Sequence, residues 1–238
     1  MEPRVDKQVL ALRGISSMAT KALLGELSIK FFAASGIAVH IESVGGVDAA
    51  KRIHNGEVFD MVLLASDAIQ RLSDAGHVAA DSRCDWAYSN VAVAVPQGHA
   101  QPPIDTEAQL KMAVLKASKL SYSTGPSGIY LSQLFAQWGM LDTLQPRILV
   151  PPAGVPVASL LAEGKVDLGF QQRSELIHQA GISLLGDLPA EVAYTTVFSA
   201  GVGAAALHDP VRQTAVREFF QFIAADQQHT CRDSFGMR

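Results

Sequence analysis

The stretch from Leu120 to Tyr130 gathers hydroxyl groups and turn residues into one loop. It reads LSYSTGPSGIY, and helix-forming residues follow it without a break. This order predicts a strand, a tight loop and the start of a helix, where free backbone N–H groups and the helix dipole attract anions. Ser123, Thr124 and Ser127 would add hydroxyl donors. The loop therefore predicts an anion site, with a plain helix N-cap as the alternative role of its serine.

Three further strand ends repeat this arrangement of a short turn before a helix. The four turns are Ser16-Ser17, Gly45-Gly46, Thr124–Gly128 and Ala153–Val155. Ligands of open α/β sheets bind beyond the carboxyl ends of the strands. Four helix N-termini that converge on one cleft would therefore form an anion cage. Ser17 would serve there as a donor or only as an N-cap, and the two glycines would admit a ligand or only form the turn.

Short apolar runs alternate with helical patterns along the chain. Predicted strands cover residues 9–15, 37–42, 59–65, 90–96, 119–122, 147–150, 166–171, 182–185 and 192–202. Predicted helices begin at 18, 48 and 153 and cover 68–75, 107–117, 129–138 and 212–225. This alternation predicts an α/β protein with mostly parallel sheets. We expect two lobes, 1–88 plus 200–238 and 89–199, with the ligand cleft between them.

Composition narrows the classes of function. The chain has 238 residues, of which 48% are hydrophobic and 18% charged, so it can bury a large core. Its net charge of −4 and the lack of a basic stripe argue against nucleic acid as a partner. Cys84 and Cys231 are too few for a disulfide framework, and the seven histidines show no metal-ligand spacing. We therefore expect no metal and no cofactor.

The sequence gives two indications about location. No apolar run is long enough to span a membrane, so we expect no membrane insertion. The N-terminal residues MEPRVDKQVLALRGISS contain no apolar stretch typical of a signal peptide. The chain as given is thus expected in the cytoplasm, or in the periplasm if a leader has been removed.

Several segments together resemble one known family. In order, they are the Ser16-Ser17 turn, AAKRIHNGEVFDMVLLAS, GPSGIY and ASLLAEGKVDLGF. The chain resembles the molybdate-binding components of ABC importers, which have a type II periplasmic-binding-protein fold, from Val9 to about Ala225. GFQQ, LPAEV and TVFSAGV are more similar to a divergent branch of that family, which includes aconitate isomerase-like proteins. The resemblance implies a two-lobed fold and a small anionic ligand.

The family holds a tetrahedral oxyanion with hydroxyls and backbone N–H groups from loops between two lobes. By position, Ser17 matches the serine of the first loop, and Gly46 or Val47 falls where a second serine would lie. Ser127 and Gly154 match the third and fourth loops. The full set of candidate ligand-binding residues is Ser16, Ser17, Gly45, Gly46, Val47, Thr124, Ser127, Gly154, Val155, Gln172 and Arg173.

The chain departs from the family pattern at three places. The second loop lacks a hydroxyl, and Gln172 stands where the family often has a tyrosine. Arg13 and Arg173 lie near site loops, whereas the molybdate pocket is usually built without a cationic side chain. Planar carboxylates suit a bidentate arginine better than a tetrahedral metalate does. Arg173 would therefore clamp a carboxylate, or it would remain a solvated charge after a strand.

Two functions from different classes remain open. The first is a solute-binding protein, a monomer that closes on a small anion and has an ABC permease as its partner if it is exported. The second is a cytoplasmic isomerase that shifts a proton within a small unsaturated polycarboxylate such as aconitate. That reaction needs a base and donors for the developing charge. The sequence does not identify the base: Glu175 and Tyr130 are the candidates, although they also fit a surface and a core position.

Overall fold

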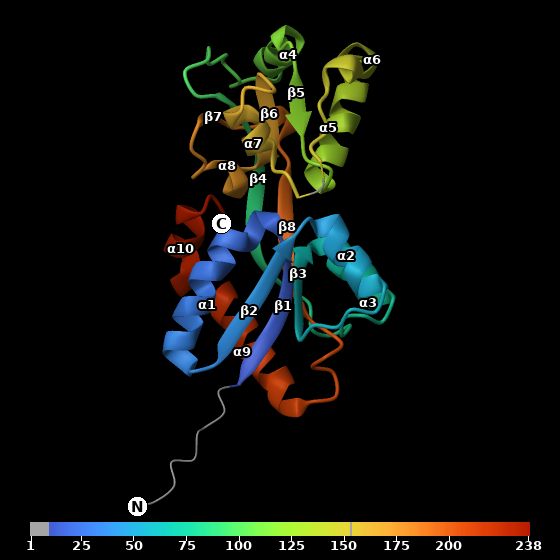
Figure 1. Cartoon of the computed structure of the whole chain (residues 1–238), viewed down its shortest axis with the longest axis vertical. Coiled ribbons are helices and arrows are strands. Elements are labelled where there is room, and N and C mark those ends of the chain that lie inside the picture. The colour runs from blue at the N-terminus through green and yellow to red at the C-terminus, as the bar shows by residue number, and fades with distance from the viewer. Residues whose placement is uncertain (1–9, 153) are drawn as a thin grey trace, which may run out of the picture. The chain divides into compact units, whose positions relative to one another are not determined.

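The computed structural model describes residues 10–152 and 154–238, which form two compact units (Figure 1). Unit 1 contains residues 10–44, 48–86 and 199–228. Unit 2 contains residues 45–47, the described part of 87–198, and 229–238. Two long strands, β4 (Cys84–Pro96) and β8 (Thr195–Val202), each carry the chain from one unit into the other.

Unit 1 is built on three parallel strands whose carboxyl ends share one edge. β1 (Ala11–Ser17) pairs in parallel with β2 (Ala38–Val44) on one side and with β3 (Met61–Ala65) on the other. α1 (Lys21–Ser35) lies on the opposite side of these strands from α2 (Gly46–His54) and α3 (Ser66–Asp74) (Figure 1). The short helix η1 (Met18–Thr20) joins β1 to α1. Three helices therefore begin at the edge where the three strands end.

Aromatic and aliphatic side chains hold these layers together. Phe31 of α1 packs edge-on against Phe219 of α9 (Pro210–Ala224), with ring centroids 5.1 Å apart. Ile15 of β1 belongs to a separate buried cluster with side chains of α2 and α3. Asp209 caps α9 by accepting from the backbone N–H groups of Val211 and Arg212. η4 (Asp226–Gln228) follows α9.

Unit 2 is organised around the part of β4 that lies in this unit. β6 (Leu168–Gln172) and β7 (Ile182–Asp187) both pair antiparallel with β4, and β5 (Leu120–Tyr122) pairs in parallel with β6. Side chains on one face of β4 pack with α4 (Glu107–Lys116) and α5 (Pro126–Gln137). Those on the other face pack with α7 (Val157–Ala162) and α8 (Arg173–Leu176). The remaining short helices are α6 (Leu141–Leu144), η2 (Gln145–Arg147), η3 (Ala190–Val192) and α10 (His229–Ser234).

The structure corrects the predicted strand at 147–150. Only Ile148 forms a bridge, with Leu120, and the N–H group of Leu149 donates to the Leu120 carbonyl at 2.8 Å. Pro151 and Pro152 follow and cannot donate ladder hydrogen bonds. Periodicity alone could not reveal that the segment lacks a continuing partner. Two other predicted boundaries, at Val9 and Ala153, lie outside the described residues.

The C-terminal segment 229–238 also lies elsewhere than the sequence suggested. It was expected in the first lobe, but it belongs to unit 2. Tyr88 and Arg238 exchange two backbone hydrogen bonds of 2.9 Å, and His178 contacts the Ser234 carbonyl at 2.6 Å. These contacts join residues far apart in sequence, so no local pattern could have predicted them.

Candidate functional site

The carboxyl end of β1 carries a buried hydroxyl group without a partner. Ser16 Oγ lies 2.8 Å from Ser43 Oγ, because the two serines are in register on β1 and β2. Ser17 is only 8% exposed, and its Oγ makes no hydrogen bond in the described structure. Its side chain does not cap the helix that follows. Buried polar groups normally have a partner, so Ser17 Oγ is available to a ligand.

Removing this hydroxyl should separate binding from stability. We expect Ser17→Ala not to lower the free energy of unfolding, since no hydrogen bond within the protein is lost and a buried hydroxyl without a partner is removed. If Ser17 donates to a bound anion, the same variant should lose about 0.5–1.5 kcal/mol of binding free energy. Urea denaturation and calorimetric titration measure the two quantities. A clear loss of stability with unchanged affinity would show that the hydroxyl serves only the fold.

The start of α2 contains two partly exposed glycines. Gly45 precedes the helix, Gly46 opens it, and Asp48 lies in its first turn. Val47 is exposed. The carboxyl ends of β1 and β2 lie side by side, so this helix start and Ser17 belong to the same edge of the sheet.

In unit 2, the loop before α5 folds tightly onto the helix start. Gly125 is the N-cap, and Ser127 Oγ lies 2.8 Å from Ser123 Oγ rather than capping the helix. A Cβ atom on Gly128 would lie 1.6 Å from the Ser123 carbonyl oxygen, so the backbone fits here only with glycine. Thr124 is exposed at the tip of the loop. The glycines and serines of this motif thus shape the turn and direct hydroxyls to the start of α5.

Gln172 is the last residue of β6 and Arg173 follows it, at the same edge as the loop before α5, because β5 and β6 are parallel neighbours. Gln172 Nε2 donates to Thr196 Oγ1 at 2.6 Å, while its buried Oε1 has no partner in the described structure. Arg173 donates to Asp187 Oδ1 at 2.9 Å, and its side chain remains 34% exposed. Asn90 Nδ2 donates to the other oxygen of Asp187 at 2.8 Å. Arg173 is therefore held in one orientation by an ion pair that the sequence did not reveal.

A second glutamine, Gln171, links β6 to α7 and α8. Its Oε1 accepts from the N–H group of Ala158 in the first turn of α7 at 3.2 Å, and its Nε2 donates to Glu175 Oε1 at 2.7 Å. Gln171 has both ends of its amide occupied within unit 2, whereas Gln172 keeps a free oxygen. Gly154 and Val155, which precede α7, are both exposed.

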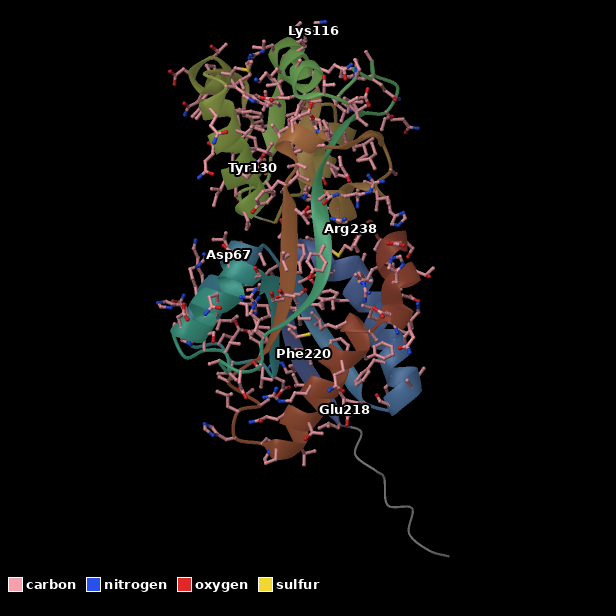
Figure 2. The ribbon with its side chains drawn as sticks, turned by 180° about the vertical axis from the view of Figure 1, so that it is seen from behind. Asp67, Lys116, Tyr130, Glu218, Phe220 and Arg238 are labelled. Atoms are coloured by element: carbon pink, nitrogen blue, oxygen red, sulfur yellow. The ribbon has the colours of Figure 1, made fainter. Side chains whose placement is uncertain are left out.

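The two candidate bases have different surroundings. Tyr130, which is labelled in Figure 2, lies on α5. It donates its hydroxyl proton to the Val192 carbonyl at 2.9 Å and stacks on Tyr194, with ring centroids 4.5 Å apart. Burial raises the pKa of the Tyr130 phenol above its usual value. Burial also raises the pKa of Glu175 to about 7, and the hydrogen bond from Gln171 partly opposes this shift. Tyr130 is thus fixed in the packing of unit 2, and Glu175 can change protonation near neutral pH.

Arg13 lies away from the carboxyl edge of β1. It lines a surface groove of about 550 Å³ between α1 and the neighbouring strands, and its guanidinium lies 5.6 Å from the ring centre of Phe59. Neither Ser17 nor Gly46 lines this groove. Within residues 10–152 and 154–238, no three His, Cys, Asp or Glu side chains group as metal ligands, and no helix is long and apolar enough to cross a membrane.

Comparison with known proteins assigns the family. Residues 12–238 match the model of the bacterial extracellular solute-binding protein family. The chain belongs to this family. An aconitate isomerase from a Pseudomonas species is 30% identical over 236 residues, which cover 97% of this chain and 88% of that protein. The family assignment confirms the solute-binding character that the sequence indicated.

Solved structures of periplasmic anion-binding proteins confirm the predicted α/β fold. The periplasmic molybdate-binding protein of Azotobacter vinelandii superposes with a TM-score of 0.78 at 21% identity, over 95% of this chain and 98% of its own. The sulfate-binding protein SubI of Mycobacterium tuberculosis gives 0.77 at 17% identity, over 96% and 86%. At such identities the likeness concerns the fold, so the ligand must be argued from this chain's own residues.

Proposed function

We propose that this solute-binding protein binds a small carboxylate anion of the aconitate type. The observation that carries the proposal is Arg173, whose guanidinium is fixed by Asp187 at the carboxyl edge of β5 and β6. One NH group serves the ion pair and the side chain is 34% exposed. The other N–H groups of a planar guanidinium can bind a carboxylate through two hydrogen bonds. The relative of 30% identity is an aconitate isomerase, which supports the same chemical class.

The other candidate residues supply donors and backbone groups in each unit. In unit 1, we propose that Ser17 donates its free hydroxyl and that Ser16 supports it. In the segment Gly45–Val47, the backbone N–H groups at the start of α2 would contact the anion. In unit 2, the donors would come from Gln172, Ser127, Thr124 and the backbone at Gly154-Val155. Gln172 can donate to the ligand when its side-chain amide is flipped. Its Oε1 then accepts from the Thr196 hydroxyl, and its NH₂ group becomes available.

Substitution of Arg173 tests the proposal. We expect wild type to bind trans-aconitate in a calorimetric titration and Arg173→Ala to bind it about 1.5–3 kcal/mol more weakly, because a charged hydrogen-bond donor is lost. Lys165→Ala is the matched control: Lys165 is an exposed cation of unit 2 that pairs with Glu163. Asp187→Asn should weaken binding less, since it only loosens the arginine. Equal affinity of wild type and Arg173→Ala would remove Arg173 from the ligand site.

A second candidate function is isomerisation of the bound carboxylate. It is favoured by Glu175, a carboxyl group of unit 2 whose pKa burial raises to about 7. The assay is interconversion of cis- and trans-aconitate by wild type. If uptake is the role instead, we propose an ABC permease as the partner and a location outside the cytoplasmic membrane, in line with the family's description. Catalytic turnover by the isolated protein distinguishes the two roles.

A further inference from the structure

Glu175 is a carboxylate without a cationic partner. Among the described residues it forms no ion pair, and its only hydrogen bond is to Gln171, through Oε1. The neighbouring charged and titratable groups are engaged elsewhere. Arg173 pairs with Asp187 of β7, and His178 contacts the carbonyl of Ser234. Glu175 Oε2 therefore has no hydrogen-bond partner among the described residues.

Gln171 fixes how Glu175 is presented. The amide oxygen of Gln171 accepts from the backbone N–H of Ala158, so its NH₂ group must face Glu175. Gln171 is buried on β6, and α8 begins two residues later, directly beyond the end of the strand. Arg173 and Glu175 both lie in α8, just beyond the carboxyl end of β6. Open α/β sheets bind their ligands at this edge. The oxygen that stays free is thus held at the end of β6 that also carries the carboxylate-binding arginine.

We propose that Glu175 is the catalytic residue that moves a proton within an unsaturated carboxylate held by Arg173, and that Gln171 is its positioning residue. This inference rests on the proposed carboxylate ligand. Tyr130, the other candidate, already donates its hydroxyl proton to the Val192 carbonyl, and its ring stacks on Tyr194. The pKa of Glu175 near 7 supports the assignment, because a general base works best when its pKa lies near the working pH.

The step balances without any other reactant. The Glu175 carboxylate takes a proton from the saturated carbon that lies between a carboxylate and the double bond of the ligand. The C–H electron pair spreads over the three-carbon unit, and the double bond moves by one position. The carboxylic acid of Glu175 then returns a proton to the far carbon. In aconitate this transfer regenerates the same three-carbon pattern, with the double bond in either the cis or the trans geometry.

The experiment compares wild type, Glu175→Gln and the surface control Glu163→Gln with trans-aconitate in D₂O. Binding is measured by calorimetry, and exchange of the allylic protons and formation of cis-aconitate by proton NMR. We expect Glu175→Gln to bind within about threefold of wild type and to lose about 10²–10⁴-fold in exchange rate, the usual contribution of a general base. The control should match wild type in both measurements. Thermal unfolding checks that each variant is folded.

The pH profile tests the positioning role of Gln171. The base must be ionised, so kcat/KM of wild type should fall as the pH decreases through about 7. The hydrogen bond from Gln171 lowers the pKa of Glu175, so Gln171→Leu should move this midpoint to higher pH. A loss of stability alone would not move the midpoint, and an unchanged midpoint would exclude the positioning role.

The outcomes distinguish this inference from the proposed function. Binding by wild type without any exchange would overturn the proton-transfer role and leave the carboxylate ligand in place. Full exchange by Glu175→Gln would also overturn it. Loss of binding by that variant would overturn it as well, because Glu175 would then bind the ligand or support the site instead of transferring a proton. Absence of binding by wild type would overturn the proposed function, and this inference with it.

Discussion

Gly128→Ala is expected to destabilise the protein by about 3 kcal/mol and to abolish ligand binding. The new Cβ atom would lie 1.6 Å from the Ser123 carbonyl oxygen and 2.7 Å from its carbon, so backbone atoms must move. Overpacking typically costs about 1–3 kcal/mol, and the upper end applies where no flexible side chain can yield. The shift would displace the loop that presents Ser123 and Ser127. Urea denaturation monitored by fluorescence measures the change.

Gly125→Ala provides the matched control three residues earlier. A Cβ atom there would meet nothing within 4 Å, and its φ of −83° suits any residue. We expect this variant to be as stable as wild type, or up to about 1 kcal/mol more stable, because alanine restricts the unfolded chain. If Gly128→Ala is no less stable than Gly125→Ala, the close approach of Ser123 to α5 is not a feature of the folded protein.

Arg212→Met is expected to cost about 3–5 kcal/mol of unfolding free energy. Asp60 has a side chain only 3% exposed, and Arg212 donates to its Oδ2 at 2.8 Å. The backbone N–H of Arg13 donates to the same oxygen at 2.7 Å. Removal of the guanidinium leaves a buried carboxylate without its counter-charge, which costs far more than loss of a surface pair. Chemical denaturation at neutral pH gives the difference.

A surface pair on the same helix serves as the comparison. Arg217 lies 3.4 Å from Asp81, whose side chain is 83% exposed, so Arg217→Met should cost only about 0–1 kcal/mol. Asp60→Asn combined with Arg212→Met should recover part of the loss, because the buried charge disappears together with its partner. Equal small losses for both arginine variants would mean that Asp60 does not depend on Arg212.

Local patterns revealed much of this architecture before any coordinates. The alternation of apolar runs with helical segments predicted the α/β class, and the turns after the strands predicted where helices begin. Ser17 and the loop 123–128 were correctly placed at the ends of parallel strands, because strand, turn and helix signals are contiguous in sequence. The role of these residues towards a ligand remains a proposal.

The contacts that decide how each side chain is used could not be predicted from the sequence. Arg173 and Asp187 are 14 residues apart and meet only because β7 returns beside α8. Gln171 and Gln172 are chemically identical, and only the packing of α7 shows which of them is anchored. The predicted strand at 147–150 failed for the same reason, since an apolar run does not specify its partner.

Thermal unfolding against a ligand panel tests the central claim most directly. The panel sets cis- and trans-aconitate and citrate beside molybdate, tungstate, sulfate and phosphate. A ligand at about 100 times its Kd adds roughly 2.7 kcal/mol, which for a chain of this size raises Tm by about 5–10 °C. We predict such a shift with the polycarboxylates. A shift with molybdate or tungstate alone would contradict a carboxylate ligand and would mean that Arg173 does not select the anion.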